Sequence, residues 1–292
     1  MHIKSYAKIN PFLDVLGKRP DGYHDLRTVM QSIDLHDDLF IKTSGGLGEF
    51  ALSASGNGAP QGEENLVWRA ASIMAKEYNI NEAFEMRLVK RIPMGAGLAG
   101  GSSNCAAALL GIRRLFGLEI PEGELASIAK SLGADVPFCL AGGTCLAEGV
   151  GERLTRLAPH PECIIVVAHP RLAVSTEKAF KSFCAEARKP NDAGLSEFLS
   201  AICHNDLTKA ALCLYNVFTD LTAGEYPVVR QLIETLEQSG ALGASMSGTG
   251  SAVFGYFSCE RAASKARQQL SGAAETFVTK PVQAANHMEV AQ

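Results

Sequence analysis

The sequence predicts a protein of two domains in the α+β or α/β class. Strand-like segments alternate with amphipathic helical segments along the chain. The chain has 292 residues, which is enough for one large domain or two. A proline-bearing stretch at residues 155–162 precedes the apolar run CIIVVA. We therefore place a domain boundary there, with residues 1–157 in the first domain and residues 158–292 in the second.

Strands and helices succeed one another in the first domain, because apolar residues switch between alternating and helical spacing. The predicted strands are residues 2–17, 21–44 and 84–92, and the predicted helices are residues 64–79 and 121–133. Pro11 disfavours a helix in the first of these segments. Pro121 near the start and Gly133 at the end are the expected boundary signals of the last helix. The third strand leads into a glycine-rich loop.

The second domain repeats this alternation. Residues 163–170 have the length and apolar character of a buried strand. Residues 241–257 have the pattern of a strand, a glycine loop and a second strand. Residues 225–240 carry apolar residues on one helical face and end at a glycine, and residues 259–271 predict another amphipathic helix.

Composition and charge exclude several classes of function. Hydrophobic residues make up 47% of the chain and charged residues 20%, as in ordinary globular proteins. The net charge of -4 argues against a broad nucleic-acid-binding surface, although it allows a site for one small anionic ligand. No secretory signal is apparent, and the apolar run at residues 163–168 is too short to span a bilayer. We expect a cytoplasmic protein without nucleic-acid or membrane partners, and the oligomeric state stays open.

The eight cysteines show no CxxC spacing, and most of them lie in apolar surroundings. They stand at positions 105, 139, 145, 163, 184, 203, 213 and 259. Free cysteine behaves as a small hydrophobic residue. We therefore expect reduced cysteines in the core and no metal–thiolate site.

Four glycines precede a helical segment in the stretch IPMGAGLAGGSSNCAAALLG, which begins at Ile92. Glycine lets backbone N–H groups face a ligand with no Cβ in the way. A helix that starts at about Ser102 adds the partial positive charge of its N-terminus. Ser102 and Ser103 supply hydroxyls for phosphate oxygens or for Mg²⁺. We interpret the loop as a phosphate-binding site; the alternative is a glycine-rich turn that only caps the helix.

The glycines alone do not decide which phosphate is bound. Residues 95–100 match the dinucleotide-binding pattern GxGxxG, and Glu119 stands near the distance of the ribose-binding acid. However, a second helix follows where that fold requires a strand, and Pro93 interrupts the strand before the loop. The pattern GxxxxGK[ST] is absent from the sequence. A nicotinamide-dependent oxidoreductase is therefore the alternative with the least support.

Three blocks of sequence resemble the GHMP kinases, the family of galactokinase, homoserine kinase and mevalonate kinase. They are PMGAGLAGGSSNCAAALL, LGADVPFCLAGGTCLAEGVGERL and GASMSGTGSAVFG, in the family's order. The opening AKINPFLDVLGKRPDGYHDL is similar to that of a branch whose acceptor is a cytidine diphosphate sugar-alcohol. The resemblance covers nearly the whole chain. It implies an α+β fold of two domains, each a mixed or antiparallel sheet with packed helices, and an active site in the cleft between them.

The resemblance also implies an ATP-dependent kinase that uses Mg²⁺. Asp135 is then the base for the acceptor hydroxyl, and Lys8 is the cation beside it and beside the transferred phosphoryl group. ATP binding is assigned to Pro93, Met94, Gly95, Ala96, Gly97, Leu98, Ala99, Gly100, Gly101, Ser102 and Ser103, and to Asn65 and Lys90. Without the resemblance, Asn65 is equally well a helix N-cap and Lys90 an exposed charge.

Two residues are candidate metal ligands. Ser103 follows the glycines, and Glu124 stands before Asp135 at the spacing where several family members carry a metal-binding glutamate. The alternative for Glu124 is a solvent-facing position on a helix.

The acceptor site is assigned through the same resemblance. Its residues are Asn10, Tyr23, His24, Thr176, Phe180, Gly248, Thr249 and Gly250. Tyr23 offers a flat face for a pyrimidine, His24 offers a donor and an acceptor to the edge of the base, and Phe180 matches the aromatic residue on its other side. Residues 248–251 would close over the substrate diphosphate and the transferred phosphate. Core packing of Phe180 and a tight turn at residues 248–251 are the alternatives.

Two further functions stay open on the sequence. A GHMP kinase for another small alcohol, such as homoserine or mevalonate, keeps the fold, but its acceptor has no base to stack on Phe180. A non-catalytic ligand sensor on the same scaffold would not need both Lys8 and Asp135. The favoured function is ATP-dependent phosphorylation of a cytidine diphosphate sugar-alcohol.

Overall fold

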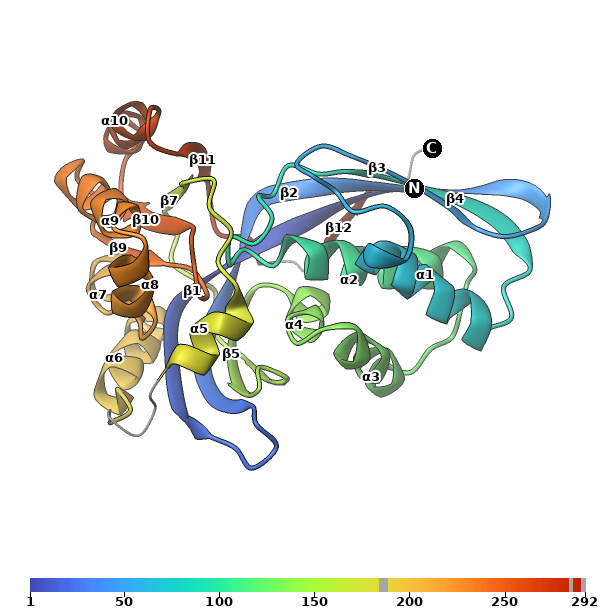
Figure 1. The fold of residues 1–292 in the computed structure, drawn as a ribbon, viewed down its shortest axis with the longest axis horizontal. Coiled ribbons are helices and arrows are strands. Elements are labelled where there is room, and N and C mark those ends of the chain that lie inside the picture. The colour runs from blue at the N-terminus through green and yellow to red at the C-terminus, as the bar shows by residue number, and fades with distance from the viewer. Residues whose placement is uncertain (184–188, 284–285, 290–292) are drawn as a thin grey trace.

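The computed structural model describes residues 1–183, 189–283 and 286–289. The chain forms two β-sheets, each with helices packed against it, in an elongated molecule of two lobes (Figure 1). Helices α1 to α4 lie together on one side of the first sheet, and α9 and α10 cover the second sheet. The prediction of an α+β architecture is confirmed.

The described residues form both long strands and short helices. The strands are β1 (His2–Lys18), β2 (His24–Leu47), β3 (Ala51–Ser55), β4 (Glu82–Val89), β5 (Thr144–Gly149), β6 (Arg153–Arg156), β7 (Ile164–His169), β8 (Tyr215–Asn216), β9 (Gly243–Met246), β10 (Val253–Phe257), β11 (Glu275–Thr279) and β12 (Asn286–Glu289). The helices are the 3-10 turn η1 (Gly62–Glu64) and α1 (Leu66–Glu77), α2 (Gly100–Leu115), α3 (Glu122–Leu132), α4 (Val136–Ala141), α5 (Thr176–Ser182), α6 (Asp192–Cys203), α7 (Leu207–Leu212), α8 (Thr219–Glu225), α9 (Val228–Gln238) and α10 (Glu260–Leu270). Within the ranges described, no helix combines the length and the apolar character needed to cross a bilayer.

The first sheet is a mixed sheet of eight strands built around the long antiparallel pair β1 and β2. Its main order is β12–β1–β2–β4–β3, with β5 paired to β2 and to β6, and β8 paired to β1. β3 and β8 run parallel to their partners. The C-terminal strand β12 returns to this sheet and pairs with the start of β1. The domain boundary at residue 157 stays a prediction.

The middle of β1 is buried on both faces, over residues 7–15. Ile9 belongs to an apolar cluster that includes residues of the second sheet, and Phe12 belongs to one that includes Phe198 of α6. A strand covered on both faces does not show the alternation of a half-exposed strand. As a consequence, the polar residues Lys8 and Asn10 are buried where the two lobes meet.

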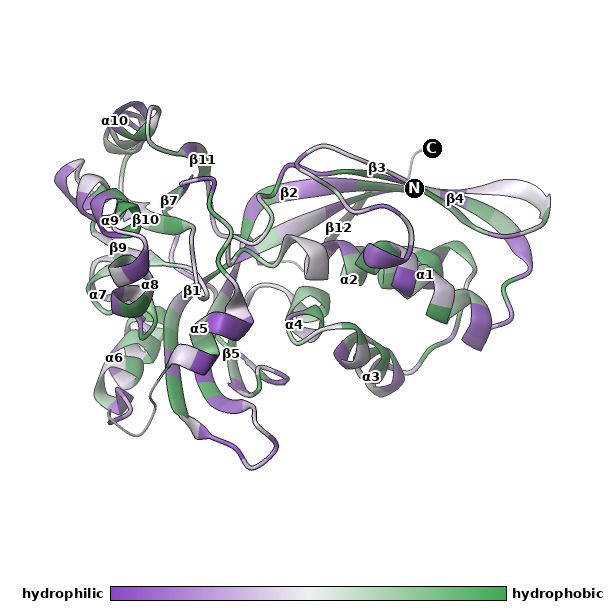
Figure 2. Ribbon diagram, viewed as in Figure 1, coloured by the Kyte–Doolittle hydropathy of each residue, from purple (hydrophilic) through white to green (hydrophobic). Residues whose placement is uncertain are grey.

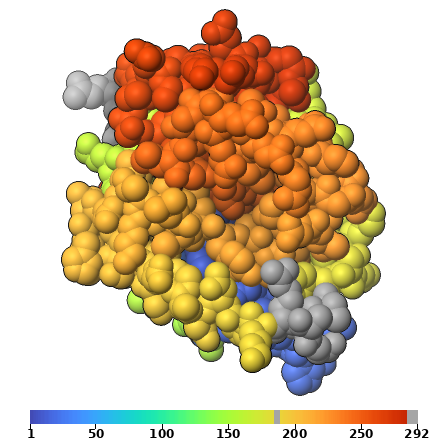
Figure 3. All heavy atoms as spheres, turned by 90° about the vertical axis from the view of Figure 1, so that its left-hand side faces the viewer, coloured from blue at the N-terminus to red at the C-terminus, as the bar shows by residue number. Residues whose placement is uncertain are grey.

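The second sheet is fully antiparallel, in the order β11–β7–β10–β9. Helix α9 buries Val229, Leu232 and Leu236, which lie on the face predicted from the helical spacing. Figure 2 shows hydrophobic colours on β7 and β10 inside this lobe and hydrophilic colours on the outer faces of α9 and α10. Figure 3 shows the face of the molecule on which these helices and α6 lie, with blue N-terminal residues visible between and below them.

The predicted elements are confirmed with shifts at their ends. Residues 241–257 form β9, a loop and β10, and residues 84–92 contain the end of β4. Helix α2 begins at Gly100 rather than at about Ser102. The first turn of a helix has unpaired N–H groups in any case, so glycine there weakens no complete turn.

The cysteines are less uniformly buried than we predicted. Cys105, Cys139 and Cys145 are buried, Cys163 and Cys213 are partly buried, and Cys203 and Cys259 are exposed. Cys203 is the last residue of α6 and Cys259 precedes α10, so both lie at helix ends on the surface. Their apolar neighbours in the sequence do not reveal this. Cys184 lies outside the described residues.

Candidate active site

The glycine loop ends in an uncapped helix N-terminus. It connects β4 to α2, which begins at Gly100 directly after Ala99. Ala99 has a φ of 53°, and no side chain caps the helix. Gly95 and Gly97 have φ values of 63° and 79°, which glycine adopts at low cost. The first N–H groups of α2 therefore lack side-chain acceptors, which is the arrangement of an anion site.

The glycine loop packs directly on the loop at residues 247–251 of the second lobe. A Cβ on Gly97 would lie 2.1 Å from the carbonyl oxygen of Ser247, and one on Gly248 would lie 3.2 Å from the Cα of Gly97. The carbonyl oxygen of Gly97 accepts hydrogen bonds from Ser247 Oγ and from Lys8 Nζ, both at 2.9 Å. Gly97 is therefore required for contact between the lobes, because a side chain there would separate the two loops.

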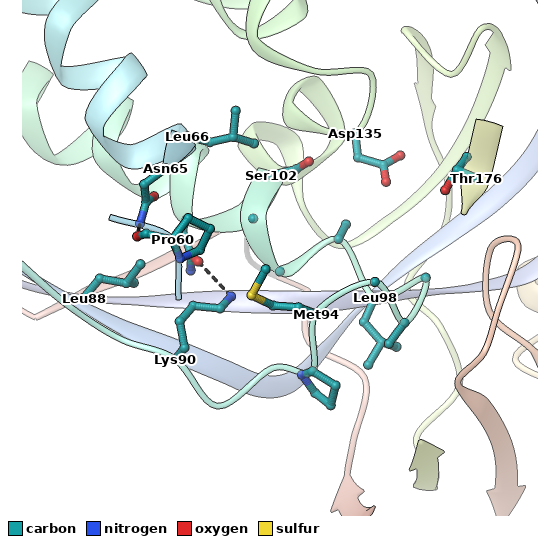
Figure 4. Close-up of a pocket in the computed structure, with 18 of the residues that line it drawn as sticks. Pro60, Asn65, Leu66, Leu88, Lys90, Met94, Leu98, Ser102, Asp135 and Thr176 are labelled. Carbon is teal, nitrogen blue, oxygen red and sulfur yellow. Dashed lines mark hydrogen bonds between the residues drawn. The ribbon is translucent and has the colours of Figure 1, made fainter. Parts of the chain in front are cut away.

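A pocket of 370 Å³ follows the glycine loop. Residues 93–102 form one wall, and the other lining residues are Pro60, Glu64, Asn65, Leu66, Leu88, Lys90, Asn104, Asp135, Thr176 and Gly250. Figure 4 shows Leu88 and Pro60 toward one end of the pocket, Met94 near its middle, and Asp135 and Thr176 at the other end. This arrangement suits a ligand with an apolar ring at one end and anionic groups along the loop.

Lys8 and Asp135, the predicted catalytic pair, come together at the polar end of the pocket. Lys8 Nζ lies 3.8 Å from Asp135 Oδ2. Asp135 directly precedes α4, and its side chain is 34% exposed, whereas that of Lys8 is 5% exposed. The Asp135 carboxylate can therefore reach a ligand in the pocket, and the buried Lys8 ammonium lies on its protein side.

Asn10 is bonded to the catalytic lysine. Its Oδ1 accepts a hydrogen bond from Lys8 Nζ at 2.7 Å, and its Nδ2 donates to Thr28 Oγ1 at 2.9 Å. Thr28 Oγ1 donates in turn to the carbonyl oxygen of Phe12 at 2.7 Å. The structure thus brings Asn10, which we assigned to the acceptor site, to the ammonium of Lys8, and both ends of its amide have partners within the protein.

Lys90 is buried, so the alternative of an exposed charge is wrong. Its ammonium pairs with Asp37 and donates to Asn104 Oδ1 at 2.9 Å. Burial lowers the pKa of Lys90, and the charge of Asp37 opposes this effect. Asp37 and Asn104 were not among the site residues predicted from the sequence. The pair of aspartates in HDDLF, within a strand-like segment, does not distinguish a buried carboxylate from an exposed one.

Asn65 is the N-cap of α1, as the alternative to ATP binding predicted. Its Oδ1 accepts a hydrogen bond from the backbone N–H of Val67, and its Nδ2 donates to the carbonyl oxygen of Pro60, both at 2.9 Å. The side chain lines the pocket, and each of its two polar atoms already has a partner within the protein. Asn65 therefore holds the segment that carries Pro60 to the rim of the pocket.

Of the two serines after the glycines, Ser102 lines the pocket and Ser103 does not. Ser103 is 1% exposed, and its Oγ has no hydrogen-bond partner among the described residues. Successive helical residues are turned by about 100°, so the two hydroxyls face different directions. The structure therefore does not bring Ser103 to the pocket as a phosphate or metal ligand.

Glu124, the other candidate metal ligand, is absent from the lining of the pocket. Its Oε1 accepts a hydrogen bond from the hydroxyl of Tyr78 at 2.6 Å, which links α3 to the end of α1 on the surface. Across residues 1–183, 189–283 and 286–289, no three His, Cys, Asp or Glu side chains are arranged to hold a metal ion.

The aromatic residues assigned to the acceptor lie at the turn between β1 and β2 and on α5. Tyr23 is 66% exposed in that turn. The rings of His24 and Phe180 have centroids 5.3 Å apart, and Phe180 also packs on Phe218 at 4.7 Å. Burial and the charge of Lys18 lower the pKa of His24. The imidazole is therefore neutral near pH 7, with one donor and one acceptor.

The second glycine loop approaches the same end of the pocket. Thr249 Oγ1 lies 3.3 Å from Thr176 Oγ1, and the carbonyl oxygen of Thr249 accepts a hydrogen bond from Thr222 Oγ1 at 3.1 Å. Thr176 and Gly250 line the pocket together with Asp135. The structure therefore brings residues 248–250 and Thr176 to the side of the predicted base.

Family models match two segments of the chain. The GHMP kinases N terminal domain matches residues 65–143, and GHMP kinases C terminal matches residues 198–275. A 4-diphosphocytidyl-2-C-methyl-D-erythritol kinase from Pelotomaculum thermopropionicum is 43% identical over 249 residues, which are 85% of this chain and 86% of the relative. The enzyme of that name from Acetivibrio thermocellus is 39% identical over 283 residues, which are 96% of this chain and 98% of the relative.

Solved structures share the architecture. A crystal structure of 4-(cytidine 5'-diphospho)-2C-methyl-D-erythritol kinase has a TM-score of 0.83 and 32% sequence identity, and the match covers 96% of this chain and 99% of that one. Homoserine kinase from Cytophaga hutchinsonii has a TM-score of 0.78 at 18% identity, over 98% of this chain and 96% of that one. The second likeness concerns the fold alone.

Both lobes and the glycine loop thus have the architecture of a small-molecule kinase, and the chain belongs to the GHMP kinase family. Within that family it groups with the 4-diphosphocytidyl-2-C-methyl-D-erythritol kinases, since relatives of that name match nearly the whole chain. The alternative of a nicotinamide-dependent oxidoreductase is excluded by this membership.

Proposed function

We propose that the chain transfers the γ-phosphoryl group of ATP to the 2-hydroxyl of 4-diphosphocytidyl-2-C-methyl-D-erythritol. The products are the 2-phosphate and ADP, in the non-mevalonate route to isoprenoid precursors. The observation that carries the proposal is the Lys8–Asp135 pair, 3.8 Å apart at the end of the glycine loop. The names of the relatives support the choice of acceptor. A cytoplasmic location stays a prediction.

In this proposal, ATP lies along the glycine loop. The apolar end of the pocket, with Pro60 and Leu88, receives the adenine ring, and Lys90 stands beside it. The N–H groups at the start of α2 receive the phosphates, because they carry partial positive charge and no side chain caps them. The γ-phosphate then points toward Asp135.

Mg²⁺ would be held at this site together with the phosphates of ATP. Mg²⁺ in kinase sites is held by few protein groups and by substrate phosphates, which suits a pocket whose lining carboxylates are Glu64 and Asp135. Ser102 is the side-chain hydroxyl at the start of α2 that lines this pocket. When bound, the metal offsets negative charge on the phosphates. Ser103 and Glu124 have no part in this proposal.

The chemical step needs a base and a cation, and the pair supplies both. The acceptor hydroxyl attacks the γ-phosphorus, and its proton passes to the carboxylate of Asp135. The bond between the γ-phosphorus and the bridging oxygen breaks, and ADP leaves. The ammonium of Lys8 favours the ionised carboxylate and stabilises charge on the transferred group. Asn10 holds that ammonium in place.

The cytidine end of the acceptor lies at the turn between β1 and β2. Tyr23 is exposed and free to close on one face of the pyrimidine, and Phe180 is positioned by Phe218 for the other. Neutral His24 offers its donor and its acceptor to the edge of the base. The loop at residues 248–250 closes over the diphosphate and the transferred phosphate, and its shape is held by the hydrogen bond from the backbone N–H of Gly250 to the carbonyl oxygen of Ser247.

Phosphate binding is tested by adding a side chain to the start of α2. Gly101 is suited to this test, since a Cβ there meets only Leu66 Cδ1 at 3.7 Å, whereas a Cβ on Gly97 or Gly100 would collide with the protein. We expect Gly101→Val to abolish ATP binding in calorimetry without unfolding the protein. Gly123→Val, in the first turn of α3 with open space around it, is the matched control. Normal ATP binding by Gly101→Val would show that the loop is only a turn.

The activity is tested by a coupled assay of ADP release. The protein is supplied with ATP, Mg²⁺ and, in separate reactions, 4-diphosphocytidyl-2-C-methyl-D-erythritol, homoserine or mevalonate. We expect release with the first acceptor alone. Release with homoserine or mevalonate would reassign the acceptor, and no release with any of them, despite ATP binding, would favour the ligand sensor.

A further inference from the structure

A carboxylate outside the pocket fastens both ends of the glycine loop. Asp37 lies on β2, and its side chain is 0% exposed. Its Oδ1 accepts hydrogen bonds from the backbone N–H groups of Arg91 and Ile92, at 2.6 and 2.8 Å, where the chain enters the loop. Its Oδ2 accepts one from Asn104 Nδ2 at 2.8 Å, where the chain has left the loop and entered α2.

The remaining partner of Asp37 is the ammonium of Lys90, which lines the pocket proposed for ATP. A Cβ on Gly100 would lie 2.9 Å from Lys90 Nζ, so the ammonium stands against the first residue of α2. Besides its bond to Asp37, the same ammonium donates a hydrogen bond to Asn104 Oδ1 at 2.9 Å. Lys90 is therefore fixed at a point where the helix and the pocket meet.

The network closes on the neighbouring strand. Asn104 Nδ2 donates to Ser5 Oγ at 2.7 Å, and Ser5 Oγ lies 3.3 Å from the carbonyl oxygen of Asp37, to which it donates. All of these side chains are buried. In such a network the loss of one member leaves the others unpaired, so its geometry is sharply defined.

We propose that Asp37 is a positioning residue of the nucleotide site, which holds the Lys90 ammonium and both ends of the glycine loop in the arrangement that binds ATP. The proposal rests on the proposed function, because ATP is taken as the nucleotide. Asp37 does not line the pocket and acts through Lys90 and the loop. Its removal therefore weakens the binding of ATP and not that of the acceptor.

The charge of Asp37 also sets the pH range in which Lys90 stays protonated. Glu64 and Asp135 line the same pocket as Lys90, and the neighbouring Arg91 pairs with Asp38 at 2.5 Å. Within the described chain, Asp37 is the carboxylate in direct contact with the ammonium. Without it, burial is no longer opposed, and Lys90 loses its proton at a lower pH. The affinity for ATP then falls at a lower pH than in the unmodified protein.

The test measures ATP binding by calorimetry, with acceptor binding measured in parallel, from about pH 6.5 to about pH 9. The variants are Asp37→Asn, Lys90→Met and the double variant. We expect Asp37→Asn to lose about tenfold to a hundredfold in ATP affinity, the range for a lost charge-assisted hydrogen bond, with unchanged acceptor affinity. The oxygen of an asparagine at position 37 can still accept from the N–H groups of Arg91 and Ile92. The double variant should therefore bind ATP no worse than Lys90→Met, and neither should show the pH dependence.

Asp38→Asn is the matched control, because Asp38 is the next carboxylate on β2 but pairs with His2 and Arg91. It should bind ATP as the unmodified protein does. Equal losses for ATP and acceptor in Asp37→Asn, or additive losses in the double variant, would overturn the proposal.

Asp37→Asn leaves a buried lysine unpaired and can fail to fold for that reason. The double variant then decides, since it leaves no unpaired buried charge. A folded double variant with the ATP affinity of Lys90→Met supports the proposal, and an unfolded one contradicts it. ATP binding by the unmodified protein is measured before any variant is compared. If the unmodified protein binds no ATP, the proposed function is contradicted.

Discussion

Two lysine–aspartate pairs stand at the glycine loop, and they differ in burial. In the pair of Lys8 and Asp135, the carboxylate is 34% exposed and the charged atoms are 3.8 Å apart. In the pair of Lys90 and Asp37, the side chains are 4% and 0% exposed and in direct contact. A carboxylate that reaches the pocket can exchange a proton with a ligand, whereas one whose oxygens are all bonded inside the protein cannot. The same two residue types therefore serve chemistry in one pair and positioning in the other.

The largest effect is expected on turnover, at Asp135. Asp135→Asn keeps the size of the side chain and removes the base, so kcat should fall by roughly 10²–10⁴, with little change in the KM for ATP. Steady-state kinetics of Asp135→Asn and Asp37→Asn, measured side by side, check this. A similar fall in kcat in both variants, with unchanged KM for ATP, would remove the distinction between the pairs.

The second effect is on stability, and here the loss is expected to be larger in Asp37→Asn than in Asp135→Asn. Asp37→Asn breaks a buried pair and should lower the free energy of unfolding by about 3–5 kcal/mol. Asp135→Asn removes a part-exposed partner and should change it by no more than about 1 kcal/mol. Urea unfolding at pH 7 measures both values. Equal losses in the two variants would mean that burial does not separate the pairs.

His160 is a buried ionisable group outside both lysine–aspartate pairs, and its hydrogen-bond partners are neutral. It therefore shows the effect of burial without a charged partner. Its Nδ1 lies 2.7 Å from the carbonyl oxygen of Pro161, and its Nε2 lies 3.0 Å from the hydroxyl of Tyr256. Burial lowers the pKa of His160 to about 4, against the raising effect of the Pro161 carbonyl. The folded protein thus keeps this ring neutral when the unfolded chain, with a pKa of about 6.5, is already protonated.

Stability from His160 is therefore complete above about pH 6.5 and is lost as the pH falls toward about 4, by up to about 3 kcal/mol. Urea unfolding at several pH values in this range should show a smaller pH dependence for His160→Gln. The same substitution at the exposed His204 is the control and should leave the dependence as it is. An unchanged slope in His160→Gln would show that burial does not govern this group.

The smallest effect is expected at the acceptor's base. Tyr23→Ala should weaken acceptor binding by about 1–3 kcal/mol, on the scale of base–aromatic stacking, and leave the KM for ATP and the stability unchanged, because Tyr23 is exposed. Phe180→Ala should lower both acceptor binding and stability, because Phe180 packs on Phe218. Kinetics and urea unfolding of the two variants separate these outcomes. A loss of ATP affinity in Tyr23→Ala would contradict the assignment of Tyr23 to the acceptor's base.

Local patterns predicted most of the fold, because apolar spacing and glycines act within a few residues. They located the two glycine loops, and the resemblance added Lys8 and Asp135, which the structure brings together. Patterns could not predict the network of Asp37, because its partner Asn104 lies 67 residues away in the sequence. A buried aspartate on a strand has the same local signature as an exposed one.

The directions of side chains on two helices explain the other differences from the predicted site. Ser102 lines the pocket and Ser103 does not, because successive residues of α2 point about 100° apart. Glu124 has suitable spacing before Asp135, but α3 turns it toward Tyr78. In both cases the residue type was suitable for the chemistry, and the direction of the side chain depended on the packing of a whole helix.

The catalytic role of the exposed pair is tested most directly by a double-mutant cycle on phosphoryl transfer. Single-turnover rates are measured for Asp135→Asn, Lys8→Met and the double variant, at saturating ATP and acceptor. If the two residues act as a unit, the double variant loses much less than the product of the two single losses. Losses that multiply would contradict this account and leave Lys8 as an independent phosphate-binding group. Near-normal transfer in folded Asp135→Asn would show that Asp135 is not the base.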